Sequence, residues 1–535
     1  MPRKQVYGKR ARTFAYTSLT PLGDWSSPGK LPNEDEKVQD IIKEFGALSV
    51  QPDNKPDKAR EEKTRRKPPL RTPVRKSQGS TLPPLSRPDD PLTRYTTPLL
   101  DLCRDQKARI CPLPFAESLA EFEDTVQVVK LAEASFSEVY RLSTKAHIGT
   151  KYEGVWKLMA LKPPPECIPK DFSEKEEDKL AYMSAVDNVL SELRLLNHMT
   201  EVPGFTVFRD LRVFLGPPPK PFVSAWRAYN KAQPKGKKSE FPDPGKKGSY
   251  GLDQLWIAIE MGDAGTDLEK ILERGNKLSV WQAWDIFWGV AIAVGKGEEI
   301  AEFEHRDLHL GNICIRSPNP SNSLHPSDSI NSSLTLGATG LSVTIIDYTL
   351  SRAKMRPSRP DSSTDAEQIA FYPLSTDPAI FEGDAAENYQ YAMYRHMRSL
   401  FLTSSALTTL NGRKLKAAEA KKSWREFCPG TNLVWLHFVL DQLLANLVPV
   451  DTDELDITIQ EKGRELHKRL RELQAWLELQ NLGVEGGLRG AADLVGVAVE
   501  EGWLTAEDVI GEVEGDGVRS EGKRKRRRRR IEKVE

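Results

Sequence analysis

The stretch Phe303–Ile315, FEHRDLHLGNICI, determines how the rest of this 535-residue chain is interpreted. Arg306 and Asp307 stand in a short polar loop, and Asn312 follows Asp307 by five positions. Phosphoryl transfer requires a carboxylate that orients the acceptor hydroxyl and an amide oxygen that holds Mg²⁺ at the phosphates. Asp307 and Asn312 have the chemistry and the spacing for these two roles.

A second candidate metal ligand follows at the end of an apolar run. Leu341–Asp347, LSVTIID, terminates in Asp347, and hard cations such as Mg²⁺ prefer carboxylate oxygens. An HRD tripeptide with Asn five residues after its Asp, followed by a strand-terminal Asp, is far more specific than any single loop carboxylate. The order of these residues therefore predicts a kinase-like fold that uses ATP and Mg²⁺.

Composition limits the class of protein. At 39% hydrophobic residues the chain can build a real core, and its length predicts one large or two-lobed domain with tails. No apolar run approaches the roughly 18 residues of a membrane span, and MPRKQVYGKR lacks the apolar segment of a signal peptide. Five scattered cysteines without a CxxC pair predict reduced thiols in a cytosolic or nuclear protein, not a metal site.

Charge is balanced overall, with 77 basic and 77 acidic residues, but both ends are distinct. Residues 1–97 are rich in Pro, Ser, Lys and Arg, so we expect a disordered basic arm in which only Val38–Leu48 could form a short helix. Residues 512–535 form a basic tail. Its block Lys523–Arg530, KRKRRRRR, indicates nuclear import or nucleic-acid contact, with a merely solvated tail as the alternative.

Residues 98–511 are predicted to form an α+β, two-lobed, kinase-like domain. For the first lobe, residues 98–260, hydrophobic patterns predict a strand–turn–strand at Thr125–Leu142, strands Val155–Leu161, Thr206–Phe214 and Leu255–Glu260, a helix Leu180–Met199 and a surface insertion Gly216–Gly251. A cleft is expected at the small-residue linker Met261–Thr266. For the second lobe, residues 267–511, we expect helices Trp281–Glu299, Tyr389–Leu410, Leu433–Leu447 and Ile457–Leu479, two short ones within Leu488–Val513, an insertion Ser317–Gly340 and a loop-rich segment Thr349–Asp384.

Lys157 and Glu192 are candidates for the ion pair that positions a lysine on the α- and β-phosphates of ATP. Lys157 lies inside a predicted strand, and Glu192 lies beside the apolar stripe of the following helix. Lys162 is a rival, but three prolines follow it and place it at a strand exit. The catalytic loop downstream favours Lys157 and Glu192 over a solvated surface pair.

The segment expected to cover the phosphates contains no glycine. Such loops use G-x-G-x-x-G because backbone amides must approach the phosphates closely. In AEASFSEV the three positions are occupied by Ala132, Ala134 and Ser137, which are small but more restricted. We expect a stiffened loop whose nucleotide contacts come from Ala132, Glu133, Ala134, Ser135, Phe136, Ser137 and Val139.

The tripeptide at the second metal ligand is Asp347-Tyr348-Thr349, where protein kinases usually have Asp-Phe-Gly. Thr349 is β-branched and resists the backbone rotation that glycine permits. No Ala-Pro-Glu follows within the expected span. These features predict an activation segment that does not switch by a flip at this tripeptide.

Several sequence stretches together resemble the haspin family of divergent histone-tail kinases. They are HRDLH-x-GN, IIDYTLSR, AWRAYN at Ala225–Asn230, DQLWIAIE and NLVWLHFVLD, and the resemblance covers roughly residues 98 to 511, about three-quarters of the chain. Two departures stand out: haspins usually have Trp where this chain has Leu310, and they usually keep glycines in the phosphate loop.

The resemblance implies a constitutively active serine/threonine kinase that phosphorylates the threonine of the Ala-Arg-Thr-Lys tail of histone three at mitosis, on chromosomes in the nucleus. Carried over by residue, Asp307 is the base, Asn312 and Asp347 bind Mg²⁺, and Lys157 pairs with Glu192. The same resemblance places Met261 at the gatekeeper position, Gly262, Asp263 and Gly265 in the hinge that meets adenine with Asp267 beside it, and Asp267, His309 and Asp377 in the peptide site.

Two carboxylates suit a peptide with a free amine and an arginine. A further acid that the family often has two residues after Asp377 is Ala379 here. Asp267 also has an alternative role as the N-cap of a helix over LEKIL. The partners implied are ATP, the histone tail and chromatin, with the kinase as a monomer. Tyr7–Arg10, YGKR, resembles the short motif by which haspins contact a cohesin regulator, and a plain basic tail is the simpler interpretation.

Two other functions fit part of the pattern. A small-molecule phosphotransferase of the aminoglycoside-kinase type has the loop HGDLHPGN, but Arg306 and the Tyr348-Thr349 pair argue against it. A pseudokinase that scaffolds chromatin would explain the glycine-free loop, but Lys157, Asp307 and the metal ligands are all present.

Overall fold

The computed structural model describes residues 90–118, 126–134, 136–144, 153–168, 180, 182–234, 238–318, 335–355, 369–401, 423–449, 457–483 and 486–510. These residues form two compact units, one within 90–190 and 208–263 and the other within 191–207 and 264–510. The division after Asp263 falls inside the predicted linker Met261–Thr266. The expected helix at Val38–Leu48 and the tail 512–535 lie outside the described residues.

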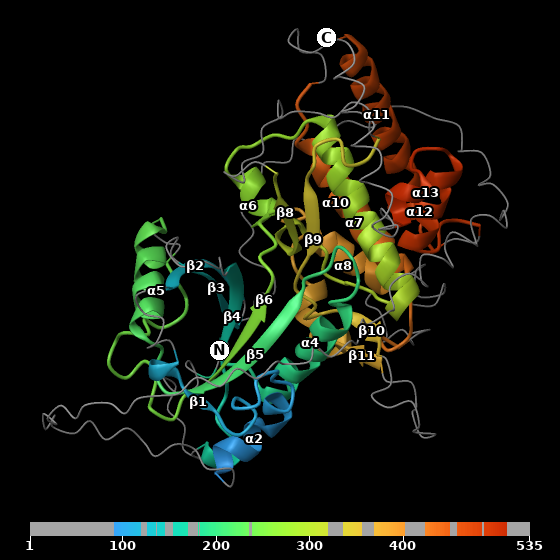
Figure 1. The fold of residues 1–535 in the computed structure, drawn as a ribbon. Helices are drawn as coiled ribbons and strands as arrows, with labels where there is room; N and C mark the ends of the chain where they lie inside the picture. The colour runs from blue at the N-terminus through green and yellow to red at the C-terminus, as the bar shows by residue number, and fades with distance from the viewer. Residues whose placement is uncertain are drawn as a thin grey trace, which may run out of the picture. The chain divides into compact units, whose positions relative to one another are not determined.

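The first unit is built on a six-stranded sheet with the order β1-β5-β6-β4-β3-β2 (Figure 1). Neighbouring strands are antiparallel except β1 and β5, which are parallel. The strands are β1 (Leu113–Pro114), β2 (Val126–Ala134), β3 (Ser137–Thr144), β4 (Glu153–Ala160), β5 (Phe208–Leu215) and β6 (Leu255–Met261). The predicted strands are confirmed, with shifts of one or two residues at their ends.

Aromatic side chains fill the core of this unit. Phe115 stacks on Phe214 with ring centroids 4.5 Å apart, and Trp256 lies 5.9 Å from Phe115. Phe222, which is fully buried, comes from the helix α5 (Lys220–Ala232). The insertion Gly216–Gly251 is therefore not merely a surface loop: α5 packs beside β2 and supplies part of the core (Figure 1).

Two predicted boundaries are wrong. The helix α2 (Pro91–Leu100) begins inside the segment assigned to the disordered arm, because Asp90 caps its N-terminus and Leu99 and Leu100 are buried. The helix predicted from Leu180 begins later, as α4 (Val186–Met199). The reason is local: the backbone of Ser184 bonds to Ala160 and Lys162 at the end of β4 and cannot also be helical.

The second unit is mainly helical and is arranged around α7 (Val280–Ala301). A capping box of Ser279 and Gln282 starts α7, and most of its residues are buried. The other helices are α6 (Leu268–Glu273), α8 (Gln390–Ser399), α10 (Gly430–Ala445), α11 (Ile457–Trp476), α12 (Ala491–Glu500) and α13 (Ala506–Ile510). Helices α10, α11 and α12 pack on α7 (Figure 1). All predicted helices of this lobe are confirmed, but α8 ends at Ser399 and residues 402–410 lie outside the description.

Glu298 ties three of these helices together from inside α7. Its carboxylate accepts hydrogen bonds from the backbone N–H groups of Ala491 and Ala492, both at 2.9 Å, at the start of α12. Asn432 of α10 donates its side-chain amide to the same carboxylate at 2.8 Å. The positive end of the α12 helix dipole therefore faces a buried acid, which is a favourable arrangement.

Short strands connect the helices. A three-stranded sheet joins β7 (Thr266–Asp267), β8 (Ile313–Arg316) and β9 (Ser342–Ile345). The loop-rich segment Thr349–Asp384 contains the pair β10 (Arg352–Lys354) and β11 (Ile369–Phe371), which the sequence did not indicate. Much of the insertion Ser317–Gly340 lies outside the described residues. Among the described helices, α7 included, none has the length and hydropathy needed to cross a membrane.

Candidate functional site

The pairing of β8 with β9 brings two predicted metal ligands together. Ile313 stands opposite Ile345, and the backbone N–H of Ile346 donates to the carbonyl of Asn312 at 3.0 Å. Asn312 and Asp347 are therefore neighbours across one strand pair, although 35 positions separate them in the sequence. The loop after α7 and the strand-terminal Asp are therefore adjacent, and their roles as metal ligands stay a prediction.

Asn312 is also tied to the base candidate Asp307. Its side-chain amide nitrogen donates to the backbone carbonyl of Asp307 at 2.8 Å, so the amide oxygen is the atom of this side chain that would contact a metal. That oxygen and the Asp347 carboxylate are the donors that Mg²⁺ prefers. No group of three or more His, Cys, Asp or Glu side chains suited to a metal occurs in the described ranges. Two protein ligands fit Mg²⁺ held largely by phosphate and water oxygens.

Arg306 and Asp347 both have a left-handed backbone, with φ of 64° at each. Such a conformation costs roughly 1–2 kcal/mol for a non-glycine residue, so other contacts must hold it. At Asp347 the hydroxyl of Thr349 donates to Oδ1 at 2.5 Å, and the Thr349 backbone N–H donates to the same atom at 3.3 Å. The β-branched residue thus gives Asp347 a partner that glycine could not supply.

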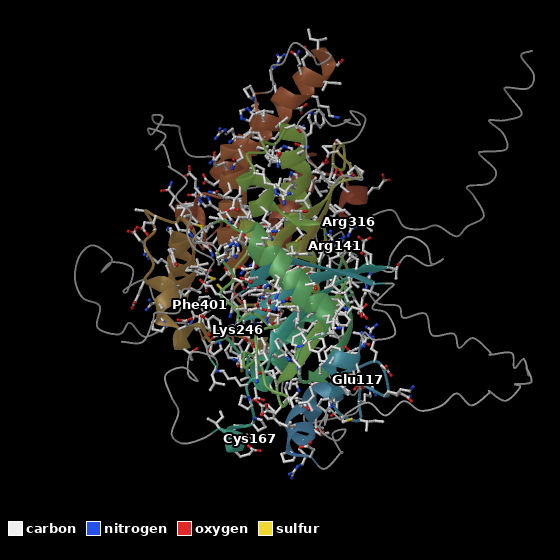
Figure 2. The ribbon with its side chains drawn as sticks, turned by 90° about the vertical axis from the view of Figure 1, so that its left-hand side faces the viewer. Glu117, Arg141, Cys167, Lys246, Arg316 and Phe401 are labelled. Carbon is white, nitrogen blue, oxygen red and sulfur yellow. The ribbon has the colours of Figure 1, made fainter. Side chains whose placement is uncertain are left out.

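Arg306 is fully buried and already paired. Its guanidinium donates two hydrogen bonds of 3.1 Å to Glu304, and Thr431 also donates to that carboxylate at 2.9 Å. The guanidinium lies over the rings of Trp424, at 5.4 Å, and Phe401, which Figure 2 labels, at 5.8 Å. Arg306 is therefore not placed to receive a phosphate from the activation segment.

Tyr348 anchors the metal tripeptide from inside the second unit. Its hydroxyl accepts a hydrogen bond from the backbone N–H of Thr206 at 2.9 Å and donates to the carbonyl of Ile345 at 3.0 Å. The side chain is 1% exposed. A flip of the tripeptide would break both bonds, which agrees with the prediction that this segment does not switch there.

The Asp307 carboxylate is held by two residues that sequence reasoning missed. Tyr394 donates its hydroxyl, and Gln390 its side-chain amide at 3.3 Å, to Asp307 Oδ1. Burial raises the pKa of Asp307 and repulsion from Asp347 adds to the rise, while the bond from Tyr394 lowers it. The only sequence signal for Gln390 and Tyr394 was their spacing of four positions, which puts both side chains on one face of α8.

Two of the three predicted peptide-site residues adjoin the catalytic loop. Asp267 on β7 pairs with Cys314 of β8, and it caps α6 by accepting from the N–H of Lys270 at 2.9 Å, as the alternative role required. His309 Nε2 lies 4.0 Å from Asp307 Oδ2. Asp377 stands between two short 3-10 turns, and no hydrogen bond or ion pair found among the described residues joins it to Asp267 or His309.

The glycine-free phosphate loop is a tight hairpin in the first unit. Phe136 lies in its turn, and Ser135 lies outside the described residues. The cross-strand pairs are Ala132 with Val139, Glu133 with Glu138, and Ala134 with Ser137. Val139 is also opposite Lys157 of β4, so these two predicted nucleotide contacts share one face of the sheet.

A buried network of charged and polar side chains, which the sequence did not reveal, contacts the hairpin. The Lys130 ammonium, whose side chain is fully buried, contacts the carboxylates of Glu138 and, at 2.6 Å, Glu133. The ring of Tyr229 on α5 lies 5.0 Å from the same ammonium. Ser239, from the insertion after α5, donates to Glu133 at 2.5 Å. We call Lys130, Glu133, Glu138, Tyr229 and Ser239 the hairpin brace.

The remaining nucleotide candidates lie near the division between the units. Met261 ends β6, Gly262 and Asp263 follow it, and the Asp263 carboxylate is 2.8 Å from Arg141 Nε. Gly265 has a φ of 94°, and a Cβ there would lie 2.3 Å from the carbonyl oxygen of Ile315, so only glycine fits. Lys157 belongs to the first unit and Glu192 to the second, and their ion pair stays a prediction.

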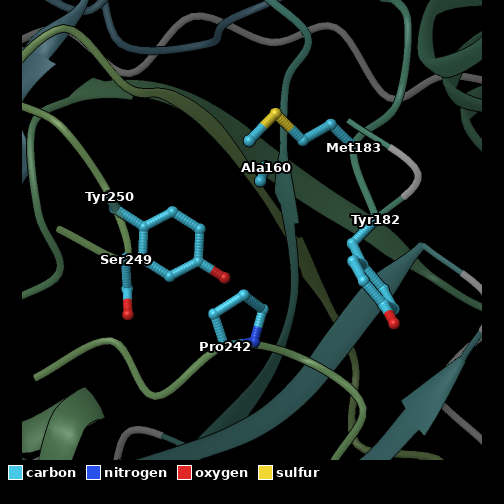
Figure 3. A pocket seen from close by; sticks show the side chains of 6 residues that line it. All are labelled: Ala160, Tyr182, Met183, Pro242, Ser249 and Tyr250. Carbon is cyan, nitrogen blue, oxygen red and sulfur yellow. The ribbon is translucent and has the colours of Figure 1, made fainter. Parts of the chain in front are cut away.

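A small hollow in the first unit is a poor candidate for a phosphate site. Ala160, Tyr182, Met183, Pro242, Ser249 and Tyr250 line it (Figure 3). None of these side chains carries a positive charge to pair with a phosphate. The hollow also involves none of the predicted site residues.

Comparison with known proteins agrees with this geometry. Residues 95–475 match the family model described as haspin like kinase domain. The serine/threonine-protein kinase haspin homolog of Drosophila melanogaster is 28% identical over 359 residues, which are 66% of this chain and 54% of the relative. The haspin homolog hrk1 of Schizosaccharomyces pombe is 28% identical over 66% of this chain and 61% of its own length. The haspin of Mus musculus is 26% identical over 63% and 38%.

The chain thus aligns with little more than half the length of the first two of these relatives. The family match nevertheless covers well over half of the chain, including both structural units and every predicted site residue from Ala132 to Asp377. The α+β architecture agrees with a kinase-like fold. The assignment of Asp307, Asn312 and Asp347 as its catalytic residues stays a prediction. The chain belongs to the haspin-like kinase domain family.

Proposed function

We propose that this protein is a serine/threonine protein kinase that transfers the γ-phosphate of ATP to the threonine of an Ala-Arg-Thr-Lys tail of histone three during mitosis. The observation that carries the kinase assignment is the single constellation of Asp307, Asn312 and Asp347, with the base carboxylate held and the two oxygen donors adjacent. The names of the relatives, serine/threonine-protein kinase haspin, support the class of acceptor.

In this mechanism Asp307 orients the acceptor hydroxyl and takes its proton. The acceptor oxygen forms a bond to the γ-phosphorus, the bond from that phosphorus to the ADP oxygen breaks, and its electron pair leaves with ADP. Asn312 and Asp347 would hold Mg²⁺, which neutralises charge on the phosphates. Lys157, paired with Glu192, would hold the α- and β-phosphates under the hairpin that contains Ala132 to Ser137.

The substrate proposal rests on charge. Asp267 and His309 adjoin the catalytic loop, and Asp377 contributes a second carboxylate from the segment after the metal ligand. Carboxylates favour a cationic peptide, and an arginine next to the acceptor can bind one in a bidentate manner. A small-molecule phosphotransferase has no need of such a pair.

We extend the proposal to location and partners. The basic block Lys523–Arg530 would direct the chain to the nucleus, where chromatin supplies the histone tail, and Tyr7–Arg10 is a candidate contact for a cohesin regulator. Replacing the block with serines should abolish nuclear accumulation of a fluorescent fusion and leave peptide phosphorylation in vitro unchanged. A variant that still accumulates in nuclei would contradict this role for the block.

One experiment separates the proposed function from its rivals. Labelled ATP is incubated with the protein and an Ala-Arg-Thr-Lys peptide, with Asp307→Asn as the matched control. The proposal expects label on the threonine with wild type and at least a hundredfold less with the variant, in line with the roughly 10²–10⁴-fold contribution of a general base. Equal, negligible transfer by both would indicate a pseudokinase. Transfer to small alcohols but not to the peptide would indicate a phosphotransferase.

A further inference from the structure

One face of α8 presents two polar side chains to the base of the catalytic loop. Gln390 and Tyr394 are separated by four positions, so they lie above one another on the helix. Both donate hydrogen bonds to the same atom, Oδ1 of Asp307, and Gln390 also donates to the Tyr394 hydroxyl at 2.8 Å. The three polar groups form a closed triangle.

The triangle is enclosed by side chains that fix its geometry. Tyr394 is 1% exposed and Gln390 is 9% exposed. The ring of Tyr394 packs edge-on against Trp435 of α10, with centroids 5.2 Å apart and planes at 75°. A buried tyrosine hydroxyl needs a partner, and here that partner is the carboxylate of Asp307. The phenol therefore cannot turn away without losing both its packing and its hydrogen bond.

The two oxygens of Asp307 consequently have different surroundings. The side-chain hydrogen bonds that Asp307 receives from the described residues go to Oδ1, while Oδ2 lies 4.0 Å from His309 Nε2. A carboxyl group on a terminal torsion with a broad, roughly two-fold profile would otherwise present either oxygen. With Oδ1 occupied, Oδ2 is the oxygen available to an acceptor hydroxyl.

We propose that Tyr394 and Gln390 are positioning residues that hold Oδ1 of Asp307 and so direct Oδ2 at the acceptor hydroxyl. This inference rests on the proposed kinase function and deepens it. Oδ2 receives the hydroxyl proton as the acceptor oxygen bonds to the γ-phosphorus, and the electron pair of the broken bond leaves with ADP. Fixing the carboxylate beforehand removes a rotational cost from the reaction.

The first test replaces Tyr394 with Phe, which keeps the ring against Trp435 and removes the hydroxyl. We expect kcat to fall roughly 10- to 100-fold, the size of a lost hydrogen bond to a charged group. Dissociation constants for ATP and for the Ala-Arg-Thr-Lys peptide should stay within about twofold. Gln390→Leu should act in the same direction. Tyr391→Phe, on the same helix but without a contact to Asp307 among the described residues, is the matched control and should retain the wild-type kcat.

The second test combines Tyr394→Phe with Asp307→Asn and measures single-turnover transfer of labelled phosphate. If Tyr394 acts through Asp307, the double variant should be no slower than Asp307→Asn alone. A further tenfold loss in the double variant would overturn the inference, as would a Tyr394→Phe enzyme with the wild-type kcat. Weakened ATP and peptide binding together with a lowered Tm would assign Tyr394 to stability instead. An inactive wild-type enzyme would refute the kinase function itself, which is a separate outcome.

Discussion

Asp307 and Asp347 are both acids of the proposed catalytic site, and we propose different roles for them. In the proposed mechanism Asp307 would face the acceptor through Oδ2, which lies 4.0 Å from His309 Nε2, and Asp347 would offer a carboxylate oxygen to Mg²⁺. Asp307→Ala should therefore lower kcat by roughly 10²–10⁴-fold with nearly unchanged ATP affinity. Asp347→Ala should weaken Mg-ATP binding itself. Steady-state kinetics and a nucleotide titration distinguish the two, and the assignment is wrong if the Asp307 variant loses nucleotide binding while the Asp347 variant stays active.

Asp377 tests the proposed peptide site. Removing one partner of a well-desolvated Arg–carboxylate pair costs roughly 2–5 kcal/mol. We expect Asp377→Ala to lower kcat/KM for the Ala-Arg-Thr-Lys peptide far more than it changes ATP affinity. Replacing the peptide arginine with alanine should cost a similar amount, and both changes together should cost less than their sum. Additive effects would mean that Asp377 and the arginine are not in contact. A peptide with Lys replaced instead of Arg serves as the control.

From the sequence alone we could predict the proximity of side chains that are close in the sequence or that stand at the ends of recognisable elements. Asp307 and Asn312 belong to one loop, and Asp347 ends an apolar strand, so their order in the sequence was sufficient to predict that they lie close together. Tyr394 and Lys130 were missed because packing determines their partners. Tyr394 lies on α8 and donates to Asp307, 87 positions away in the sequence, and the Lys130 ammonium contacts the ring of Tyr229, which lies on α5. A buried lysine and a helical tyrosine have no distinctive local pattern.

At the scale of elements, the hairpin of β2 and β3 is supported by a buried network of charged and polar side chains. The hairpin brace links it to α5 and to Ser239 of the insertion. Ser239→Ala removes one bond of that link and leaves the buried charges paired. We expect the KM for ATP to rise several-fold with little change in kcat, because a loose hairpin binds the nucleotide less well. Ser249→Ala in the same insertion is the control, and an identical KM in both variants would refute the link.

Elements with long apolar runs were predicted well, and those set by tertiary contacts were not. The strand β6 and the helix α7 are buried almost throughout, so their patterns are continuous. The start of α4 was misplaced because a backbone bridge at Ser184 overrides helical periodicity. α5 lies in a stretch rich in Pro, Gly and Lys, where local composition hides an amphipathic helix whose partner is the sheet.

At the scale of the whole molecule, two described residues that could respond to phosphorylation of the activation segment are already held by other contacts. Arg306 is paired with Glu304, and Tyr348 is anchored by two hydrogen bonds. Protein made in bacteria and treated with a phosphatase should therefore retain most of its kcat. Mass spectrometry would verify that phosphate had been removed, and mock-treated enzyme is the control. A large loss of rate after dephosphorylation would show that the segment does need the modification.

The contacts of Glu298 in α7 have a practical consequence for where the folded chain can be truncated. The family match ends at residue 475, yet the Glu298 carboxylate accepts hydrogen bonds from the start of α12, and Trp476 stacks on Trp503 with ring centroids 4.5 Å apart. A fragment that stops at residue 475 would leave the Glu298 carboxylate without these hydrogen bonds in apolar surroundings. The free energy of unfolding should fall by roughly 1–3 kcal/mol for the lost hydrogen bonds, and by more for the lost packing. In calorimetry a fragment of residues 90–476 should therefore have a lower Tm than a fragment of residues 90–510. Glu298→Gln should reduce this difference in Tm. We therefore expect the cooperatively folded unit of this protein to extend past the end of the family match at residue 475.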